Sequence, residues 1–437
     1  MKVKIDRLGI NGEGVTRGSE GSLVDKVGFV RYAIDGEIVD IDVKKNNAKF
    51  FEGELKSVLA PSPDRIKPKC SFFGKCGGCD IQHISKDKQL EFKQSLVKDT
   101  LKKVGRIDVE VMPIVRCNDW NYRNKMVWPY VDNGKEYVLG MFENSSHKVV
   151  DIDTCYISNE ILNTVFKITK KYLKLSGYSA YNYKTKTGDI KYVVARVSGD
   201  SILITIVAMR KIDLEQYYAI IEKTFKNAGI SLIISSNGKD ILDGEYYHCF
   251  GIESLEIEEL GVKFAVDNRG FLQINREVMS KLYSMVLEEI QEGDYVIDAY
   301  SGAGLMSSMI ARKASEVVGI EINKSASNSA KMLAKSNNIT NLKSICGDVK
   351  NIIGDYLNNE KIVVVLDPPR SGCDGEVLTK LLDRVQNIKK IIYVSCNPAT
   401  LARDLSILST KYEVSKVVPF DMFVQTKHVE TLVCLQR

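Results

Sequence analysis

The sequence has no run of 18 consecutive apolar residues among its 437. A helix that spans a bilayer needs about 20 such residues, so we expect no membrane partner. The first residues, MKVKIDRLGINGEG, also have no apolar core of the kind that a secretory signal peptide carries. We therefore expect a cytoplasmic protein and, in the simplest case, a monomer.

Long repeats and low-complexity segments are absent as well. The composition, with 44% hydrophobic and 27% charged residues, is that of an ordinary globular protein. The length predicts two or three domains.

The charge is small overall but unevenly distributed. The net charge of the chain is +5, yet from Arg65 to Arg106 there are 11 lysines and arginines against 4 aspartates and glutamates, a local surplus of +7. Such a surplus suits a polyanion such as RNA. A solvated lysine-rich surface would give the same pattern, so both interpretations stay open.

Residues 1–58 are predicted to form a small β-barrel. Glycines punctuate a turn at residues 8–15, and the segments 24–30, 37–43 and 50–58 alternate like half-buried strands. A five-stranded barrel fits this pattern, and such barrels often bind oligonucleotides. Three prolines between residues 61 and 68 then mark a linker.

Residues 59–260 are predicted to form a middle α+β domain. A helix is expected from Ser85 to Val104, with a serine that can cap its start. Its lysines, Lys86, Lys93, Lys98 and Lys102, are expected to line the exposed side. Further along, the pattern predicts a hairpin (192–197 and 201–208), a helix (214–228) and a strand (232–235).

Residues 261–437 alternate between strand and helix. Strands are predicted at 295–299, 317–322, 361–366 and 390–395, with helices between them. This is the pattern of a doubly wound parallel sheet. The fold class is therefore multidomain: a barrel, an α+β middle domain and a C-terminal α/β Rossmann-like domain.

A glycine loop lies at the start of this C-terminal domain. The strand that ends at Ala299 runs into Ser301-Gly302-Ala303-Gly304, which resembles a dinucleotide fingerprint with Ser307 at the third glycine position. Glu321 closes the next strand, where an acid often holds ribose hydroxyls. Taken alone, the loop suits a nicotinamide dinucleotide, S-adenosylmethionine or a merely structural turn.

Three further segments follow strand ends: Leu366-Asp367-Pro368-Pro369-Arg370, Val394-Ser395-Cys396-Asn397-Pro398, and the stretch from Asp421 to Glu430. Ligands of open α/β sheets sit beyond the carboxyl ends of the strands, so Asp367 and Cys396 should share a crevice with the glycine loop.

Chemistry explains why such a crevice would need a thiol and an acid. Carbon 5 of uracil is a poor nucleophile, and a thiolate that adds to carbon 6 activates it for methylation. A base must then remove the carbon 5 proton. The hypothesis makes Cys396 the nucleophile and Glu430 the base. Taken singly, a cysteine after an apolar strand is more often a buried small residue, and Glu430 a surface acid.

Together these segments resemble the RNA 5-methyluridine methyltransferase family. Its SCNPAT loop matches residues 395–400 and its DMFxxTxHVE ending matches residues 421–430. The resemblance implies a class I methyltransferase fold that uses S-adenosylmethionine, with Cys396 as nucleophile and Glu430 as base. It also places cofactor contacts on Gln273, Tyr300, Glu321 and Asp367, and an RNA-binding TRAM domain at the N-terminus.

A cysteine cluster precedes the predicted helix. Cys70, Cys76 and Cys79 are closely spaced, and Cys155 is a candidate fourth ligand. Four thiolates suit a [4Fe–4S] cluster or structural zinc, and the spacing alone favours zinc slightly. The sequence CGGCDIQH, from Cys76, resembles the cluster-bearing ribosomal-RNA branch of the family, which implies iron–sulfur.

The same resemblance favours 23S ribosomal RNA as the substrate over the T-loop of transfer RNA, although some cluster-bearing relatives act on transfer RNA. The segment from Trp120 to Lys125 is similar to an RNA-contact segment of the family. Two other classes remain to be weighed. A radical methylthiotransferase would normally carry CxxxCxxC, whereas Cys70 is six residues before Cys76. A non-catalytic RNA-binding or ribosome-assembly protein would not need Asp367, Cys396 and Glu430.

Overall fold

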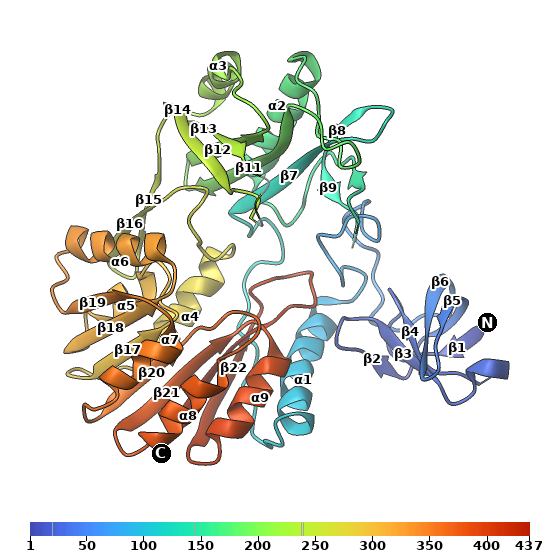
Figure 1. Cartoon of the computed structure of the whole chain (residues 1–437). Helices are drawn as coiled ribbons and strands as arrows, with labels where there is room; N and C mark the ends of the chain where they lie inside the picture. The colour runs from blue at the N-terminus through green and yellow to red at the C-terminus, as the bar shows by residue number, and fades with distance from the viewer. Residues whose placement is uncertain (20, 145, 237, 239) are drawn as a thin grey trace.

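The computed structural model of the protein describes residues 1–437 except residues 20, 145, 237 and 239. Its described residues form three large sheets and two pairs of short strands. Figure 1 shows the N-terminal strands as a separate small body, the middle sheet above, and the C-terminal sheet with its helices below.

The N-terminal sheet has the strand order β1-β5-β6-β4-β3-β2. Its elements are β1 (Lys2–Lys4), β2 (Arg7–Leu8), β3 (Gly14–Arg17), the short 3-10 helix η1 (Gly21–Leu23), β4 (Val27–Val30), β5 (Ile38–Asn46) and β6 (Phe50–Ala60). One bent chain segment forms both edges, because β1 pairs with β5 while β2 pairs with β3. The first strands thus lie at both edges of the six-stranded sheet, an arrangement that fits the small barrel expected from the sequence.

The helix α1 (Lys86–Lys103) begins after Ser85, whose hydroxyl accepts a hydrogen bond from the Lys88 N–H. It packs against the helix α9 (Pro398–Leu408) and shares the core of the C-terminal sheet. Figure 1 shows the two helices side by side. This helix, encoded early in the chain, therefore stabilises the C-terminal domain.

One expectation about α1 is wrong. Lys98 and Lys102 are exposed as predicted, but the Lys93 side chain is fully buried, with 0% of its surface exposed. Its Nζ lies 2.5 Å from Oδ1 of Asp421, which is itself buried. A lysine enters a protein interior when an acid compensates its charge, and that acid comes from a segment 328 residues away.

The middle sheet has the order β14-β13-β12-β11-β7-β8. Its strands are β7 (Lys125–Asp132), β8 (Tyr137–Leu139), β11 (Ile190–Ser198), β12 (Ser201–Ala208), β13 (Asn227–Ser235) and β14 (Gly244–Gly251). The helices α2 (Glu160–Leu175) and α3 (Glu215–Thr224) pack against each other and on this sheet. The two short pairs are β9 (Met141–Phe142) with β10 (Val149–Val150), and β15 (Leu255–Glu259) with β16 (Val262–Val266).

The predicted hairpin is confirmed, since β11 and β12 pair up to the Ser198–Ser201 position around a turn at Gly199. The predicted helix 214–228 is too long. The helix α3 ends at Thr224, and β13 begins at Asn227 as a parallel partner of β12. Pairing with a buried central strand outweighs the helical pattern of residues 225–228.

The C-terminal sheet has the order β19-β18-β17-β20-β21-β23-β22. Its strands are β17 (Tyr295–Ala299), β18 (Glu316–Glu321), β19 (Leu342–Cys346), β20 (Ile362–Leu366), β21 (Ile388–Ser395), β22 (Glu413–Phe420) and β23 (Glu430–Gln436). The remaining helices are α4 (Arg276–Glu288), α5 (Leu305–Ile310), α6 (Lys324–Ser336), α7 (Val349–Ile352), η2 (Ile353–Tyr356) and α8 (Gly375–Asp383).

Five of these strands, β17 to β21, are parallel, which confirms the doubly wound sheet. The strand β23 runs antiparallel to both β21 and β22. The start of β23 therefore lies at the same edge as the carboxyl end of β21. Within the described part of the chain, no helix is both long and apolar enough to cross a bilayer.

Candidate active site and cysteine cavity

Four of the predicted site residues lie at the carboxyl edge of the C-terminal sheet. Tyr300 follows β17, Glu321 ends β18, Asp367 follows β20 and Cys396 follows β21. Since the sheet order there is β18-β17-β20-β21, these residues lie in a row across four neighbouring strands. This is the edge where open α/β sheets bind ligands.

The glycine loop is shaped for close approach of a ligand to the backbone. Gly302 and Gly304 have φ angles of +55° and +77°, in the left-handed region that glycine tolerates. A Cβ atom on Gly304 would lie 2.5 Å from the Cβ of Ala330, so a larger residue would not fit. One carboxylate oxygen of Glu321 accepts a 3.0 Å hydrogen bond from the Gly302 N–H. The acid is thus fixed at the loop, with lone pairs left for ligand hydroxyls.

Gln273 comes from a different part of the fold, the segment between β16 and α4. Its carbonyl accepts a 2.9 Å hydrogen bond from the Asn124 side chain, and the Asn124 N–H donates to the Ile274 carbonyl at 2.9 Å. The structure therefore places Gln273 where the middle region joins the C-terminal domain.

Cys396 and Glu430 are brought together by strand register. Ser395, the last residue of β21, pairs with Thr431 of β23, so the next residue on one strand and the preceding residue on the other are neighbours. Cys396 is half-buried, whereas the Glu430 side chain is only 3% exposed. Burial raises the pKa of Cys396, and the charge of Glu430 raises it further.

The two acids of this site differ in exposure. Asp367 is exposed to solvent, whereas Glu430 is buried. Burial raises the pKa of Glu430 well above that of an ordinary glutamate, and the charge of Asp367 adds to the effect. Three groups that become negative on losing a proton therefore lie close together, and Glu430, the most buried of them, has the least access to water.

Arg370 supplies the compensating positive charge. The positive charge of its guanidinium lowers the pKa of both Cys396 and Glu430. The Arg370 carbonyl accepts hydrogen bonds from the side chains of Asn397 at 3.1 Å and Thr400 at 3.2 Å, which anchor it to the turn that carries Cys396. The LDPPR segment includes Arg370, for which no role was predicted from the sequence. A thiolate and two acids that lie close together need a compensating cation, and this requirement could have pointed to Arg370.

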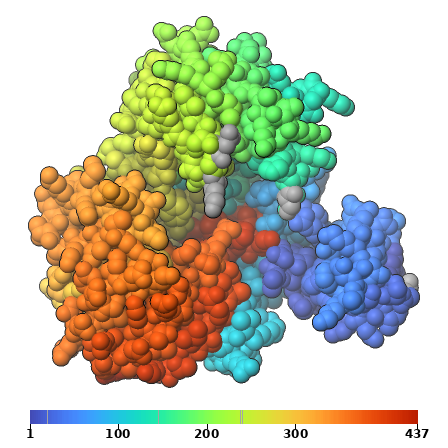
Figure 2. All heavy atoms as spheres, viewed as in Figure 1, coloured from blue at the N-terminus to red at the C-terminus, as the bar shows by residue number. Residues whose placement is uncertain are grey.

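A cleft of about 440 Å³ lies beside these residues. Its lining combines Arg370 and His428 of the C-terminal domain with Arg123 of the middle region and Asp80 of the cysteine segment. Figure 2 shows the molecule hollowed between the middle region and the C-terminal domain. The volume lies within the range of about 300–1,000 Å³ that is typical of ligand sites.

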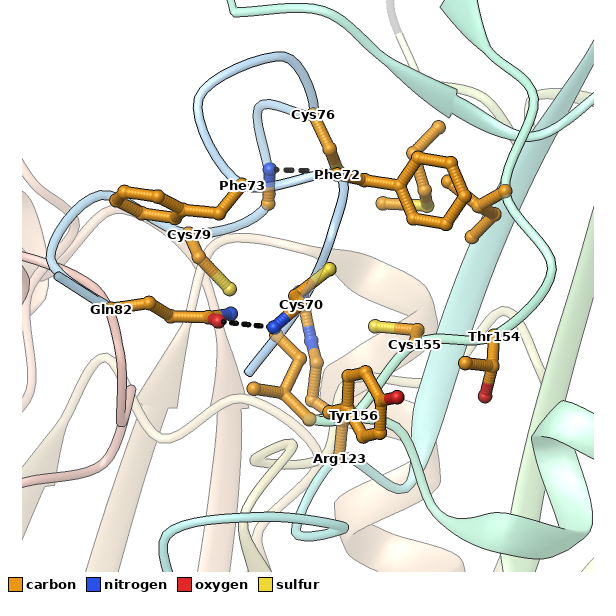
Figure 3. A pocket seen from close by; sticks show the side chains of 14 residues that line it. Cys70, Phe72, Phe73, Cys76, Cys79, Gln82, Arg123, Thr154, Cys155 and Tyr156 are labelled. Atoms are coloured by element: carbon orange, nitrogen blue, oxygen red, sulfur yellow. Dashed lines mark hydrogen bonds between the residues drawn. The ribbon is translucent and has the colours of Figure 1, made fainter. Parts of the chain in front are cut away.

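The four predicted metal cysteines converge on one cavity. Cys70, Cys76 and Cys79 come from the segment before α1, Cys155 comes from the segment before α2, and all four line the cavity as free thiols. Figure 3 shows these four side chains around a common space. Burial raises the pKa of Cys76 to about 11, and the charges of Cys155 and Cys70 contribute to the shift.

The rest of the cavity wall is mainly apolar, with Phe72, Phe73, Met141, Ile152 and Ile157 among its residues. The Gly78 N–H also points at the Cys76 sulfur, 3.4 Å away. Among the residues that the structure describes, no three histidine, cysteine or acidic side chains are grouped closely enough to hold a metal ion. The four cysteines thus line one cavity without forming a compact metal-binding group among the described residues.

Comparison of this sequence with known protein families identifies the kind of enzyme that carries this site. The chain matches the family described as tRNA (Uracil-5-)-methyltransferase over residues 85–348 and 347–437. The chain belongs to this family. It is an S-adenosylmethionine-dependent RNA methyltransferase that acts on carbon 5 of uracil, as expected from the sequence.

Full-length relatives agree with this assignment. An RNA methyltransferase of Clostridium tetani is 33% identical over 446 residues, covering 99% of this chain and 95% of the relative. One of Caldanaerobacter subterraneus is 34% identical over 448 residues, covering 100% and 98%. The crystal structure of the Pyrococcus abyssi tRNA (uracil-54, C5)-methyltransferase with S-adenosyl-L-homocysteine has the same fold, with a TM-score of 0.80, 24% identity and full coverage of both chains.

Proposed function

We propose that this enzyme methylates carbon 5 of a uridine in 23S ribosomal RNA through a covalent bond between Cys396 and carbon 6 of the base. The observation that carries the proposal is the pairing of β21 with β23, which sets Cys396 beside Glu430 at the ligand-binding edge of the sheet. The organisation we propose is a TRAM-like RNA-binding barrel (1–58), a middle domain with the cysteines (59–260) and a methyltransferase domain (261–437). The enzyme would act as a cytoplasmic monomer.

Gln273, Tyr300, Glu321 and Asp367 would hold S-adenosylmethionine. Glu321 fits this role because the glycine loop fixes its carboxylate while leaving acceptor sites for ribose hydroxyls. Tyr300 follows β17 with a φ angle of +66°, unusual for a residue with a side chain, which directs the loop across the edge of the sheet. The cofactor supplies a methyl group bonded to a positively charged sulfur.

The residues of the chain would then act in order. The Cys396 thiolate adds to carbon 6 of uracil, and the electron pair of the 5,6 double bond moves towards carbon 5 and oxygen 4. Carbon 5 takes the methyl group, and the electrons of the broken sulfur–methyl bond stay on the cofactor sulfur. Glu430 removes the carbon 5 proton. The released electrons restore the double bond and expel the Cys396 thiolate.

The electrostatics of the site suit this sequence of steps. Arg370 favours the thiolate form of Cys396, because its guanidinium lowers the pKa of that thiol. Burial gives Glu430 a raised pKa, so its ionised form is a stronger base than an ordinary carboxylate.

We also propose that Cys70, Cys76, Cys79 and Cys155 hold a [4Fe–4S] cluster. The donor set is four soft sulfur ligands in a largely apolar cavity, which suits such a cluster. A structural zinc ion would need all four sulfurs about 2.3 Å from one point. The CGGCDIQH segment that starts at Cys76 resembles the cluster-bearing branch of the family, and this resemblance favours the cluster over zinc. Bound there, the cluster would cross-link the two cysteine-bearing segments.

The metal content of protein purified without air tests the cluster assignment directly. We expect about four irons per chain and broad visible absorption. Colourless protein that contains one zinc per chain would contradict the cluster.

The RNA substrate is supported by less direct features. The barrel reaches the catalytic domain, where Lys427 donates a 3.0 Å hydrogen bond to the Asn11 side chain next to the cleft residue His428. The segment from Trp120 to Lys125 adds aromatic and cationic side chains that could hold an unstacked strand. The second candidate substrate is a uridine in the T-loop of transfer RNA, which the family description favours.

Tritium release distinguishes these substrates. The protein would be incubated with S-adenosylmethionine and two transcripts tritiated at carbon 5 of uridine, one ribosomal and one transfer RNA. We expect tritium in water from the ribosomal transcript. Release from the transfer RNA alone would keep the mechanism and overturn the substrate. A Cys396→Ala variant that released tritium at the normal rate would overturn the mechanism.

A further inference from the structure

Gln425 joins two distant parts of the chain at the active site. It lies in the loop between β22 and β23, residues 421–429, which we call the catalytic loop because it leads directly to Glu430. The Gln425 carbonyl accepts hydrogen bonds from the N–H groups of Asp80 at 3.0 Å and Ile81 at 3.2 Å. Its side-chain oxygen accepts a further bond, at 3.0 Å, from the side-chain amide of Gln89 in α1.

The backbone of Gln425 is held in an unfavourable conformation. Its φ angle is +66°, in the left-handed region that residues with a side chain rarely adopt, and only 6% of the residue is exposed. Such a conformation persists where the surrounding structure enforces it. Here the hydrogen bonds that Asp80, Ile81 and Gln89 donate to Gln425 enforce this conformation.

The two preceding carbonyls of the catalytic loop are held by other elements. Lys93 of α1 donates to the Phe423 carbonyl at 3.1 Å, and the Tyr122 hydroxyl donates to the Val424 carbonyl at 3.0 Å. Three consecutive peptide groups are thus fixed by three separate segments. Only the third of these attachments comes from the segment that carries the cysteines.

Asp80 connects this attachment to the cysteines, because it directly follows Cys79 in the chain. Its backbone holds Gln425, and its carboxylate accepts a weaker 3.4 Å hydrogen bond from the Lys427 N–H. The cysteine segment therefore holds the catalytic loop through hydrogen bonds to Gln425 and Lys427. These residues lie on either side of residue 426, which is four residues before Glu430.

We propose that Gln425 is a positioning residue whose side chain ties the catalytic loop to the cysteine segment and so fixes Glu430 for proton removal. The link runs through the side-chain amide of Gln89, which donates both to Gln425 and, at 3.0 Å, to the Ile81 carbonyl. The proposal rests on the proposed function, because that function makes Glu430 the base. Cys396 lies on the turn between β21 and α9, which these bonds do not hold. Loosening Gln425 should therefore slow proton removal while the Cys396 adduct still forms.

The test is a Gln425→Gly variant of the full protein purified without air. Glycine accepts the +66° backbone angle but lacks the side-chain amide. The substitution therefore removes the link to Gln89 without adding strain, and it keeps the backbone bonds from Asp80 and Ile81. Loss of one buried hydrogen bond corresponds to a change of about tenfold. We expect tritium release from carbon 5 to slow by about that factor. In the same reaction, labelled RNA should accumulate as a covalent protein adduct on a denaturing gel.

Two further variants show whether the tie itself is responsible. Gln89→Ala breaks the same bond from the other side and also removes the bonds of this amide to the Ile81 and Ile84 carbonyls. It should therefore give at least as much adduct accumulation, and the double variant should be no slower than Gln89→Ala alone. Gln94→Ala is the matched control, because this residue of the same helix donates a 3.1 Å bond to the Val111 carbonyl instead. Its reaction should match that of the unmodified enzyme.

The outcomes are distinct. Tritium release by Gln425→Gly at the unmodified rate would overturn the proposal. An equal loss of adduct formation and tritium release would also overturn it, because that pattern indicates general damage to the fold. The unmodified enzyme, measured alongside, reports on the proposed function by itself. If it releases no tritium from any RNA, the assignment of Glu430 fails and this inference fails with it.

Discussion

Replacing Lys93 with methionine tests the buried ion pair that anchors the catalytic loop. The Nζ of Lys93 lies 2.5 Å from the Asp421 carboxylate, and the two side chains are 0% and 3% exposed. Burial lowers the pKa of Lys93, and the charge of Asp421 counteracts that shift. Methionine has a similar length, so the substitution removes the charge with little loss of volume. It leaves the Asp421 carboxylate buried without its cation.

The expected cost follows from this geometry. Removing one partner of a buried ion pair costs about 3–5 kcal/mol, because the other charge is left uncompensated. Replacing both partners with apolar residues is often neutral. A Lys93→Met/Asp421→Leu double variant should lose only the hydrogen bond to the Phe423 carbonyl, about 1 kcal/mol. The double variant should therefore be more stable than Lys93→Met alone by about 2–4 kcal/mol.

Urea unfolding followed by circular dichroism measures the free energy of unfolding of each protein. The unmodified enzyme, both single variants and the double variant are compared in one buffer. The transition that includes α1 is the relevant one, because a chain with several domains need not unfold in one step. Lys98→Met, at an exposed position of the same helix, serves as the control and should change stability by less than about 0.5 kcal/mol. A loss below about 1 kcal/mol for Lys93→Met, or a double variant no more stable than that single one, would refute the reasoning.

Four other predictions concern Glu430, Arg370 and Cys79. Glu430→Gln should lower turnover by at least about 100-fold, and the RNA adduct of Cys396 should accumulate on a denaturing gel. Because burial raises the folded-state pKa of Glu430, the unmodified protein should lose stability relative to this variant as the pH rises above the ordinary glutamate value of 4.5, which unfolding at several pH values would show. Arg370→Met should raise the pKa of Cys396, so its alkylation by iodoacetamide should require a higher pH, and Arg370→Lys should shift it less; an unchanged profile would contradict the role of this cation. Cys79→Ser should lower the iron content of protein purified without air, and iron content equal to that of the unmodified protein would exclude Cys79 as a ligand.

The row of site residues at the sheet edge could be predicted from local sequence. Asp367 and Cys396 each follow a short apolar strand, and the carboxyl ends of parallel strands meet at one edge. The glycine loop carries its own signal, because only glycine fits the backbone angle and the close approach at Gly304. The cysteine spacing likewise indicated a shared site, and the structure brings all four thiols to one cavity.

Other features could not be predicted, because their partners are distant in the chain. Lys93 has the sequence context of an exposed helical lysine, and only Asp421, 328 residues later, explains its burial. Gln425 is an unremarkable residue in sequence, and its partner Gln89 is 336 residues away. The end of α3 likewise depends on a tertiary contact, the pairing of β13 with β12.

The sequence by itself determined the order of strands and helices, the glycine turn and the residue types of the site, because periodicity, turn chemistry and motif spacing are local properties. Only the tertiary structure decided which of those residues meet. The antiparallel insertion of β23 beside β21 sets Glu430 next to Cys396. The packing of α1 on the C-terminal domain allows Lys93 and Gln89 to hold the catalytic loop. These contacts form because burying the apolar surfaces of α1 and the sheet draws together segments that no local pattern connects.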